Sequence, residues 1–433
     1  MKDIIHYIIR FLIGEEISDE IVQAVGYTSD RNLYQHYKLV IVPSSFFNES
    51  VYGTPASMPK LPLQEIENVP LLFGSNKVEW VGNTWVVHAD VIASTFFLIT
   101  RYEEIIRKDV RDEHGRFPGK ESLLYRAGCI HRPIVDKYRI LLRRWLRQVH
   151  LQVPEIENQI QKVWLTHDVD SPFYCRTLRN VIRETVKGAG LIQAGKWYLG
   201  SLEKDPYYTF PWMFEQTEQL KKVIGDQRCH SLLFFKAGGK STQDRPVYSL
   251  RSKDLKRLLA LCRDQKALIG LHSSYSAGKN PELIQTEKDL LEKQLGVTIT
   301  YNRHHYLACR EPRDVEELEK SGITDDFTMG YADVSGFRLG TCYPVRWINP
   351  ETFRLTQLTL HPLIIMDCTL NEPKYMGLSY DKAEALCTRL LEEVKKVGGE
   401  IVLLWHNTSF QKNIQESYHC KLYLYLLNKL TKR

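Results

Sequence analysis

Short apolar runs alternate with longer stretches of helical spacing over most of the chain after residue 160. The runs predict strands at 163–167, 231–236, 267–271, 297–301, 322–328, 362–367 and 401–405. Between several of them, apolar residues recur at helical spacing over 211–224, 253–264, 282–294, 313–320 and 380–397. This alternation predicts right-handed crossovers and a parallel sheet. Seven strands would suit an irregular barrel, and an open doubly wound sheet is the alternative because pattern alone does not show closure.

The first 155 residues predict a smaller α/β domain. An amphipathic helix is expected over 4–13, a strand over 38–42, a proline-rich connection over 55–70, and helices over 89–106 and 133–149. The last helix carries four arginines away from its apolar stripe, which we interpret as a solvated basic face rather than an anion site: Arg139, Arg143, Arg144 and Arg147. The predicted domains are 1–155 and 156–433.

Composition excludes several classes of function. Of 433 residues, 43% are hydrophobic, which is enough for a sizeable core. Lysine and arginine number 58 against 52 acidic residues, and a net charge of +6 on this length gives no sign of a surface that binds nucleic acid or lipid. The nine cysteines are scattered without a CxxC pair, and no window is apolar enough to span a membrane, so we expect a cytoplasmic protein with reduced thiols. Phosphate-cradling glycine motifs are absent from the sequence.

Three predicted strands end on ionisable residues. Asp168 and Asp170 follow the first strand, His272 follows the strand at 267–271, and His406 follows the last one. Parallel sheets bring the carboxyl ends of their strands together, so these side chains are candidates for one metal-assisted hydrolytic site. Each has a plainer interpretation when taken alone, because an aspartate often caps a helix and a histidine often lies in a hydrogen-bonded core.

Two further segments offer polar groups of the right kind. Arg303, His304 and His305 follow the strand at 297–301, and adjacent histidines on an extended segment point apart, so at most one is expected to face the site. Asp333 and Arg338 could pair to orient a base or a substrate. A structural salt bridge in a loop is an equally good interpretation of that pair.

The segments THDVD, GLHSSYS, RHHYL, GYADVSGFR and LLWHN occur in an order that resembles the polysaccharide deacetylase (NodB-homology) carbohydrate esterases. The resemblance covers about 164–410. Residues 1–155, with STFFLITRYEE and RDEHGRFPGK, resemble an N-terminal region of unknown function that precedes deacetylase-like domains in some Bacteroidetes proteins. No activity follows from that region.

The family resemblance implies a distorted (β/α)7 barrel and assigns roles to individual residues. Asp168 would be the catalytic base, and Asp170 and His272 would be metal ligands. Where the family carries the second histidine of H-x-x-x-H, this chain has Ser276. A divalent metal, expected to be zinc, would therefore be bound more loosely, take a water as ligand, or recruit another side chain such as His305. Arg303 would orient the base, and His406 would be the general acid. Tyr275, Ser276, Arg303, Asp333 and Arg338 are the expected substrate-side residues.

The function expected from this resemblance is removal of an N-acetyl group from an amino sugar or a surface-polysaccharide precursor. Asp168 would take a proton from a metal-activated water, a backbone N–H near Tyr275 would help to stabilise the oxyanion, and His406 would protonate the departing amine. Two alternatives remain open. The chain could be a non-catalytic glycan-binding or assembly protein, or it could hydrolyse another C–N amide. The sequence does not indicate the oligomeric state.

Overall fold

The computed structural model describes residues 1–310, 312–410 and 417–432, and its contacts divide the chain into two compact units. Unit 1 comprises 1–160, 329–364 and 389–401, and unit 2 comprises 161–328, 365–388 and 402–433. The first boundary lies close to the predicted domain boundary at 155. The compact units are nevertheless interleaved in sequence, because two later segments pack with the first 160 residues.

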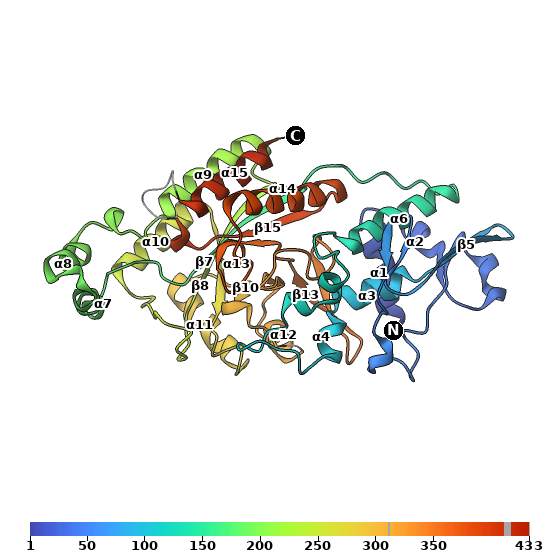
Figure 1. Cartoon of the computed structure of the whole chain (residues 1–433), viewed down its shortest axis with the longest axis horizontal. Coiled ribbons are helices and arrows are strands. Elements are labelled where there is room, and N and C mark those ends of the chain that lie inside the picture. The colour runs from blue at the N-terminus through green and yellow to red at the C-terminus, as the bar shows by residue number, and fades with distance from the viewer. Residues whose placement is uncertain (311, 411–416, 433) are drawn as a thin grey trace. The chain divides into compact units, whose positions relative to one another are not determined.

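Unit 2 is built around a parallel sheet, as the alternating pattern predicts (Figure 1). Seven strands lie in the order β11-β10-β9-β8-β7-β15-β14. Their bounds are β7 Lys162–Val169, β8 Cys229–Phe235, β9 Leu268–Ser273, β10 Tyr301–His304, β11 Asp325–Asp326, β14 Ile365–Met366 and β15 Glu400–Leu404. Among the described residues no pairing joins β11 to β14, so the order of these seven strands is open.

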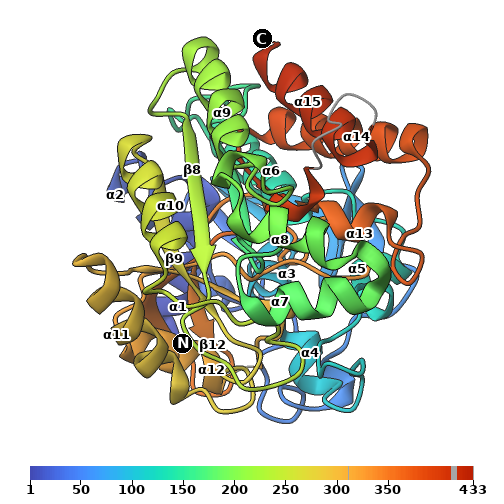
Figure 2. The ribbon, with the colours of Figure 1, turned by 90° about the vertical axis from the view of Figure 1, so that its left-hand side faces the viewer.

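The central strands are buried over nearly their whole length. Leu232, Leu233, Phe234 and Phe235 of β8 are each fully buried, and β7 is parallel to β8 from Val163↔Cys229 to Val169↔Phe235. Continuous apolar runs of this kind are typical of parallel sheets that helices cover on both faces. Figure 2 shows α9 (Phe210–Ile224) and α10 (Lys253–Asp264) beside β8. The other helices of this part of the chain are α7 (Leu178–Glu184), α8 (Leu191–Leu199), α11 (Leu283–Leu295), α12 (Arg313–Lys320), α13 (Asp367–Asn371), α14 (Tyr380–Val397) and α15 (Tyr418–Thr431).

The sequence pattern located most of these elements. The five predicted helices correspond to α9, α10, α11, α12 and α14. The strand expected at 297–301 begins later, at Tyr301, and continues to His304. Four helices of unit 2 were not predicted: α7, α8, α13 and α15. In α7 (Leu178–Glu184) and α8 (Leu191–Leu199), the exposed apolar residues do not produce the usual division between apolar and polar faces.

Unit 1 contains a four-stranded sheet in the order β1-β2-β6-β5. The strands are β1 Val25–Tyr27, β2 Leu39–Ile41, β6 Thr84–Ala89 and β5 Gly74–Val81, and β3 (Gln64–Ile66) pairs with β4 (Val69–Leu71) inside the predicted proline-rich connection. The helices are α1 Lys2–Ile13, α2 Asp19–Gln23, α3 Val91–Ile99, α4 Tyr102–Ile106, α5 Leu123–Arg126 and α6 Ile134–Gln148. The helix predicted over 89–106 is two helices, since Arg101 between them adopts a left-handed conformation.

The interpretation of a solvated basic face on α6 is wrong for two of its arginines. Arg139 and Arg143 are 6% and 4% exposed. Arg139 donates to the carbonyl of Phe11, and Arg143 donates to the carbonyl of Ile13 at 2.8 Å. These carbonyls belong to the last turn of α1, where the unpaired C=O groups and the helix dipole favour a cation. Helical spacing alone does not show that another helix ends against this face.

A strand pair in unit 1 was not predicted. β12 (Val345–Asn349) and β13 (Arg354–Leu360) are antiparallel, with Val345 opposite Leu360. Every second residue from Thr356 to Leu360 is buried, and this two-residue period is typical of a strand with one buried face.

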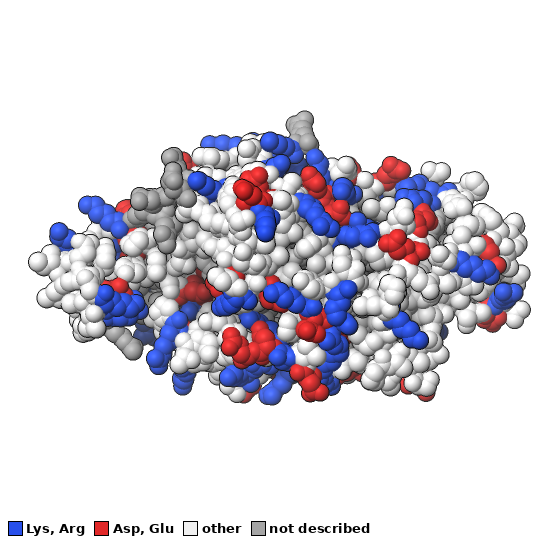
Figure 3. All heavy atoms as spheres, viewed as in Figure 1, with Lys and Arg blue, Asp and Glu red and all other residues white. Residues whose placement is uncertain are grey.

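Charged residues of both signs are interspersed over the face that Figure 3 shows, in keeping with the small net charge. All nine cysteines are free. Within the described ranges, no helix is both long and apolar enough to cross a bilayer.

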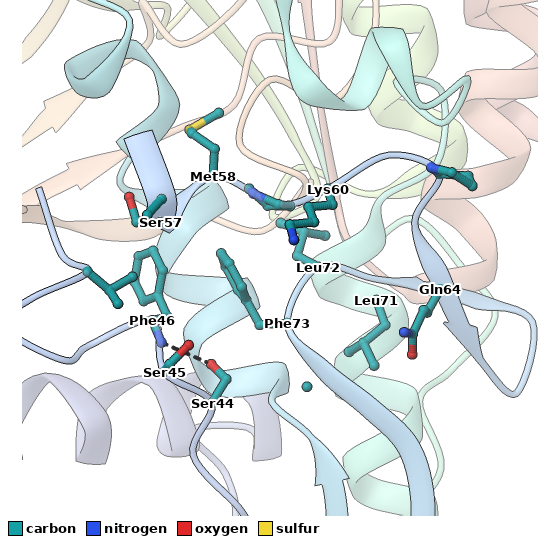
Figure 4. Close-up of a pocket in the computed structure, with 15 residues that line it drawn as sticks. Ser44, Ser45, Phe46, Ser57, Met58, Lys60, Gln64, Leu71, Leu72 and Phe73 are labelled. Carbon is teal, nitrogen blue, oxygen red and sulfur yellow. Dashed lines mark hydrogen bonds between the residues drawn. The ribbon is translucent and has the colours of Figure 1, made fainter. Parts of the chain in front are cut away.

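Unit 1 also has a cavity of about 270 Å³ between the loops around Ser44, Lys60 and Phe73 (Figure 4). Lys60 is the one charged residue among those that line it. The side chains that line this cavity include no acid–base pair and no group of metal ligands.

A candidate metal centre at the ends of the strands

The ionisable residues predicted at strand ends meet at one edge of the unit 2 sheet. Asp168 and Asp170 stand at and just beyond the end of β7, and because one residue separates them they lie on the same side of the strand. Nε2 of His272, at the end of β9, lies 3.6 Å from Oδ2 of Asp168 and 3.3 Å from Oδ1 of Asp170. The sequence pattern therefore placed these three groups correctly.

His305 completes a group of three possible ligands. Its Nε2 lies 3.2 Å from Oδ1 of Asp170, and its ring centre lies 5.0 Å from that of His272. One donor atom from each of Asp170, His272 and His305 lies within 4.8 Å of the others. His304 points elsewhere, toward Asn302 and Thr328, so only one of the adjacent histidines faces the centre, as expected.

Hydrogen bonds on the far side of each ring orient the two imidazoles. Nδ1 of His272 lies 2.8 Å from the backbone carbonyl of Arg303, and Nδ1 of His305 lies 3.3 Å from Oδ1 of Asp244. An Nδ1–H that donates to such an acceptor leaves the Nε2 lone pair for a metal ion. Nε2 of His272 and Oδ1 of Asp170 are buried and have no hydrogen-bond partner. Unpaired acceptors facing one another are costly without a cation, so the residues present fit a divalent metal.

The donor set also fits the expected kind of ion. Two imidazole nitrogens and one carboxylate oxygen suit zinc or a similar divalent ion, and three protein ligands leave a coordination position open. The Asp170 side chain is 29% exposed although its Oδ1 is buried, so solvent reaches part of this residue. Burial alone would raise the pKa of Asp170, but when the His305 and His272 rings carry a proton on Nε2 in the absence of a cation, they hold it well below its ordinary value.

Ser276 does not reach the ligand group. Its hydroxyl donates to Oδ2 of Asp244 at 2.7 Å, and it accepts from the backbone N–H of Lys240. Asp244 therefore links Ser276 and His305, and the hydrogen bonds that it accepts outweigh burial and lower the pKa of Asp244 below its usual range. Sequence reasoning missed Asp244, which lies in a loop with no apolar periodicity to place it.

The backbone N–H groups near Tyr275 are not available for an oxyanion. The N–H of Tyr275 donates to Oδ1 of Asp244 at 2.7 Å, and the N–H of Ser276 donates to Oδ2 at 3.2 Å. The Tyr275 side chain is buried and packs against Tyr306. The role expected for a backbone N–H at this position is therefore wrong, because the same carboxylate that holds His305 occupies both donors.

The buried Arg303 donates a hydrogen bond to Asp168 and fixes the orientation of its carboxylate. Nη1 of Arg303 donates to Oδ1 of Asp168 and to Oγ1 of Thr166, both at 2.9 Å. Nε of Arg303 donates to the carbonyl of Phe327 at 3.0 Å, and the guanidinium lies 4.6 Å from the centre of the Phe234 ring. Arg303 is fully buried, so its contacts are with Asp168 and the strand ends rather than with a substrate.

His406 stands on the opposite side of Asp170. Its Nε2 lies 3.8 Å from Oδ2 of Asp170, while its Nδ1 lies 2.9 Å from Oδ1 of Asp367. The backbone N–H of His406 donates to the other oxygen of Asp367 at 2.8 Å. Burial opposes the charged imidazole, but the Asp367 carboxylate outweighs burial and raises the pKa of His406 to about 10. Sequence reasoning also missed Asp367, although it is the last residue of the strand predicted at 362–367.

Lys236 is a further charged group at this edge. Its ammonium lies 3.9 Å from Oδ1 of Asp170 and donates to the backbone carbonyls of Asp244 and Pro246. Burial lowers the pKa of Lys236. The ammonium partly balances the carboxylates of the centre and ties the loop that contains Asp244 to the end of β8.

Asp333 and Arg338 belong to unit 1 and make their contacts there. Asp333 accepts from the backbone N–H groups of Gly119 and Lys120 at 2.7 and 3.2 Å. Arg338 donates to both oxygens of Glu104 at 3.0 and 2.8 Å. The sequence suggested an ion pair between Asp333 and Arg338, and in the structure each residue contacts these other partners instead. Neither residue joins the group at the ends of the unit 2 strands.

Comparisons with known proteins cover parts of the chain. Residues 3–151 match a family model described as "Family of unknown function (DUF7033)", in the region for which the sequence resemblance expected a family without assigned activity. No curated protein matches the chain.

Among solved structures, one similar chain is described as "Crystal structure of putative polysaccharide deacetylase from Mycobacterium smegmatis". It is 14% identical with a TM-score of 0.39, and the match covers 65% of this chain and 86% of that one. A likeness at this level defines neither the fold nor the chemistry of this chain.

Proposed function

We propose that the chain is a metal-dependent hydrolase that removes an N-acetyl group from an amino sugar or from a precursor of a surface polysaccharide. The observation that carries the proposal is that possible ligand atoms of Asp170, His272 and His305 lie close together. Two of these atoms, Nε2 of His272 and Oδ1 of Asp170, are buried and have no hydrogen-bond partner. On this proposal, residues 156–433 are a deacetylase-like domain, and the strands around β7 are the core of a distorted (β/α)7 barrel.

Asp170, His272 and His305 would hold the metal, which we expect to be zinc. Such an ion supplies Lewis acidity and lowers the pKa of a bound water. Asp168 would accept the proton of the attacking water, and the hydrogen bond from Arg303 at 2.9 Å would fix the orientation of its carboxylate. The acetamide carbon gains the water oxygen and loses the nitrogen, and His406 donates the proton that the departing amine requires. Acetate and a free amino sugar are the products.

Two hydrogen-bonded pairs near Asp170, Arg303 with Asp168 and Asp367 with His406, favour catalysis over simple binding. Asp168 is held by Arg303, and His406 is held by Asp367 through two contacts of 2.8 and 2.9 Å. Groups whose orientation is fixed by a charged neighbour are typical of acid–base catalysts. A glycan-binding surface needs neither a buried arginine behind an aspartate nor a charged carboxylate behind a histidine.

The first test is metal content by elemental analysis of the purified protein. We expect about one divalent ion per chain in the wild type and in Ser276→Ala, and loss in Asp170→Asn, His272→Ala and His305→Ala. Asp168→Asn should retain the metal while release of acetate from N-acetylated sugars is lost. A protein that takes up no metal after reconstitution would contradict the proposal, and so would a His305→Ala variant that binds metal like the wild type.

Substrate profiling separates the proposed reaction from hydrolysis of another C–N amide. Acetate release from N-acetylated mono- and oligosaccharides is compared with hydrolysis of formamides and cyclic amides by the same metal-loaded protein. A preference for the second group would assign the centre to a different amide.

A further inference from the structure

The helices α7 and α8 carry a dense group of exposed aliphatic side chains. Between 178 and 199, these are Leu178 (66% exposed), Ile182 (66%), Val186 (82%), Leu191 (67%), Ile192 (79%) and Leu199 (82%). Figures 1 and 2 show the two helices side by side in unit 2. We call this segment the helical hairpin 178–199. Contiguous exposed aliphatic residues of this size mark a surface that contacts another apolar phase.

Helical spacing explains why these residues share faces. Leu178, Ile182 and Val186 recur every four residues through α7 and the turn that follows it. In α8, Leu191 and Ile192 lie on the same face as Leu199, which is about two turns further on. Two glycines with positive φ, Gly188 and Gly190, lie between the helices and permit the tight turn.

The opposite faces of the two helices already have a core of their own. Cys175, Val181 and Ala194 are buried together, and the rings of Tyr174, Trp197 and Tyr198 pack against them. The exposed aliphatic residues are therefore not a core left unfilled by the hairpin. They are a second apolar surface that faces away from the first.

The hairpin is held at its base rather than loosely attached. Nε of Arg176 lies 3.1 Å from Oδ2 of Asp205, and its Nη1 and Nη2 donate to the carbonyls of Gly200 and Ser201, each at 2.7 Å. Arg176 thereby links the residues that precede α7 to those that follow α8. This connection fixes the direction in which the exposed surface faces.

The charge of the hairpin selects the kind of partner. Between 178 and 200 the sequence has four basic residues, Arg179, Arg183, Lys187 and Lys196, and one acidic residue, Glu184. Glu184 is buried and contacts Arg183 at 2.9 Å and the Tyr174 hydroxyl at 2.5 Å. In Figure 3 the region that Figure 1 labels α7 and α8 is largely white, with blue spheres and a few red ones among the white. Exposed aliphatic side chains flanked by lysine and arginine are typical of surfaces that enter an anionic bilayer interface.

We propose that the helical hairpin 178–199 binds the surface of an anionic lipid bilayer. Leu191, Ile192 and their neighbours enter the boundary between headgroups and acyl chains, while Arg183, Lys187 and Lys196 contact lipid phosphates. We would expect a surface that binds a protein partner to carry a more even mixture of basic and acidic side chains. This inference does not depend on the hydrolytic function, because it rests on residues outside the metal centre.

Vesicle co-sedimentation of the full chain tests this proposal. Binding is measured to vesicles of phosphatidylcholine alone and to vesicles of phosphatidylcholine mixed with phosphatidylglycerol. We expect clear binding to the mixed vesicles, a loss of about tenfold or more in Leu191→Ser/Ile192→Ser, and a loss of about tenfold in Arg183→Gln/Lys187→Gln that vanishes at high salt. The matched control is Val223→Ser/Val297→Ser, which removes two aliphatic residues that are 59% and 53% exposed outside the hairpin. It should bind like the wild type.

Three results would overturn the proposal. The wild type could fail to sediment with either vesicle, the hairpin and control variants could bind equally, or binding could be the same with and without anionic lipid. If the wild type fails to bind, light scattering shows whether a second copy covers the surface, in which case Leu191→Ser/Ile192→Ser would dissociate a dimer. Circular dichroism and metal content, unchanged in every variant, show that the chain remains folded.

Discussion

Oδ1 of Asp244 lies 3.3 Å from Nδ1 of His305, on the side of the ring that faces away from Asp170. This contact sets the direction of Nε2 and so makes His305 usable as a ligand. The same carboxylate accepts hydrogen bonds from the N–H of Tyr275 and the hydroxyl of Ser276. One buried group therefore connects the loop after β8, the loop after β9 and the end of β10.

Replacing Asp244 should weaken metal binding without removing a ligand. In Asp244→Asn we expect the affinity for zinc to fall by about 10–100-fold, because His305 loses its charged acceptor. Competition with a chromophoric chelator measures the affinity. Asp226→Asn, an exposed aspartate of the same unit, is the control and should leave it unchanged. Equal affinities for zinc in the two variants would show that Asp244 stabilises the loop after β9 without affecting metal binding.

Arg303 should act on catalysis through Asp168. In Arg303→Lys the metal should remain, and kcat should fall by about a hundredfold, because an ammonium cannot contact Asp168, Thr166 and the carbonyl of Phe327 together. The double variant with Asp168→Asn should be little worse than Asp168→Asn alone, since the two residues work as a unit. Additive losses would contradict this coupling. Acetate release under saturating substrate measures each rate.

Asp367 should control the protonation of His406. The pKa of His406 is raised to about 10, with Asp367 as the strongest influence opposing burial. In Asp367→Asn the imidazole should lose its proton at lower pH, so the alkaline limb of the kcat/KM profile should move toward neutral pH. Titration of the His406 ring by NMR in the metal-free protein gives an independent value. An unchanged titration would show that another group holds the proton.

Unit 1 should show a pH dependence that comes from Asp136. Burial is the main cause that raises the pKa of Asp136 to about 6, against hydrogen bonds from Thr341 and the N–H of Cys342. The folded state binds the proton more tightly than the unfolded state, so stability is greatest at low pH and falls as pH rises from the unfolded pKa through about 6. The total change is on the order of 3 kcal/mol.

Unfolding of the wild type and of Asp136→Asn across this pH range checks the assignment. The variant should lose the decline in stability, whereas Asp109→Asn, which changes an exposed aspartate, should keep it. A decline that persists in Asp136→Asn would assign the effect to a different group.

The sequence predicted the parts of the site that follow regular strands. Asp168, Asp170, His272 and His406 each come directly after or at the end of an apolar run, and the topology of a parallel sheet brings such positions together. Asp244 could not be found this way, because it lies in an irregular loop. The burial of Arg139 and Arg143 was also hidden, since it depends on where α1 ends and not on the spacing within α6.

The hydroxyl of Ser276 contacts Asp244, while His305, directly after β10, places its imidazole beside Asp170. Two imidazoles thus lie beside one carboxylate although the residue four positions after His272 is a serine. A motif search that requires the second histidine four residues after the first would pass over proteins built in this way. A pattern that joins D-x-D to a single histidine and a later R-H-H would collect chains with the spacing found here.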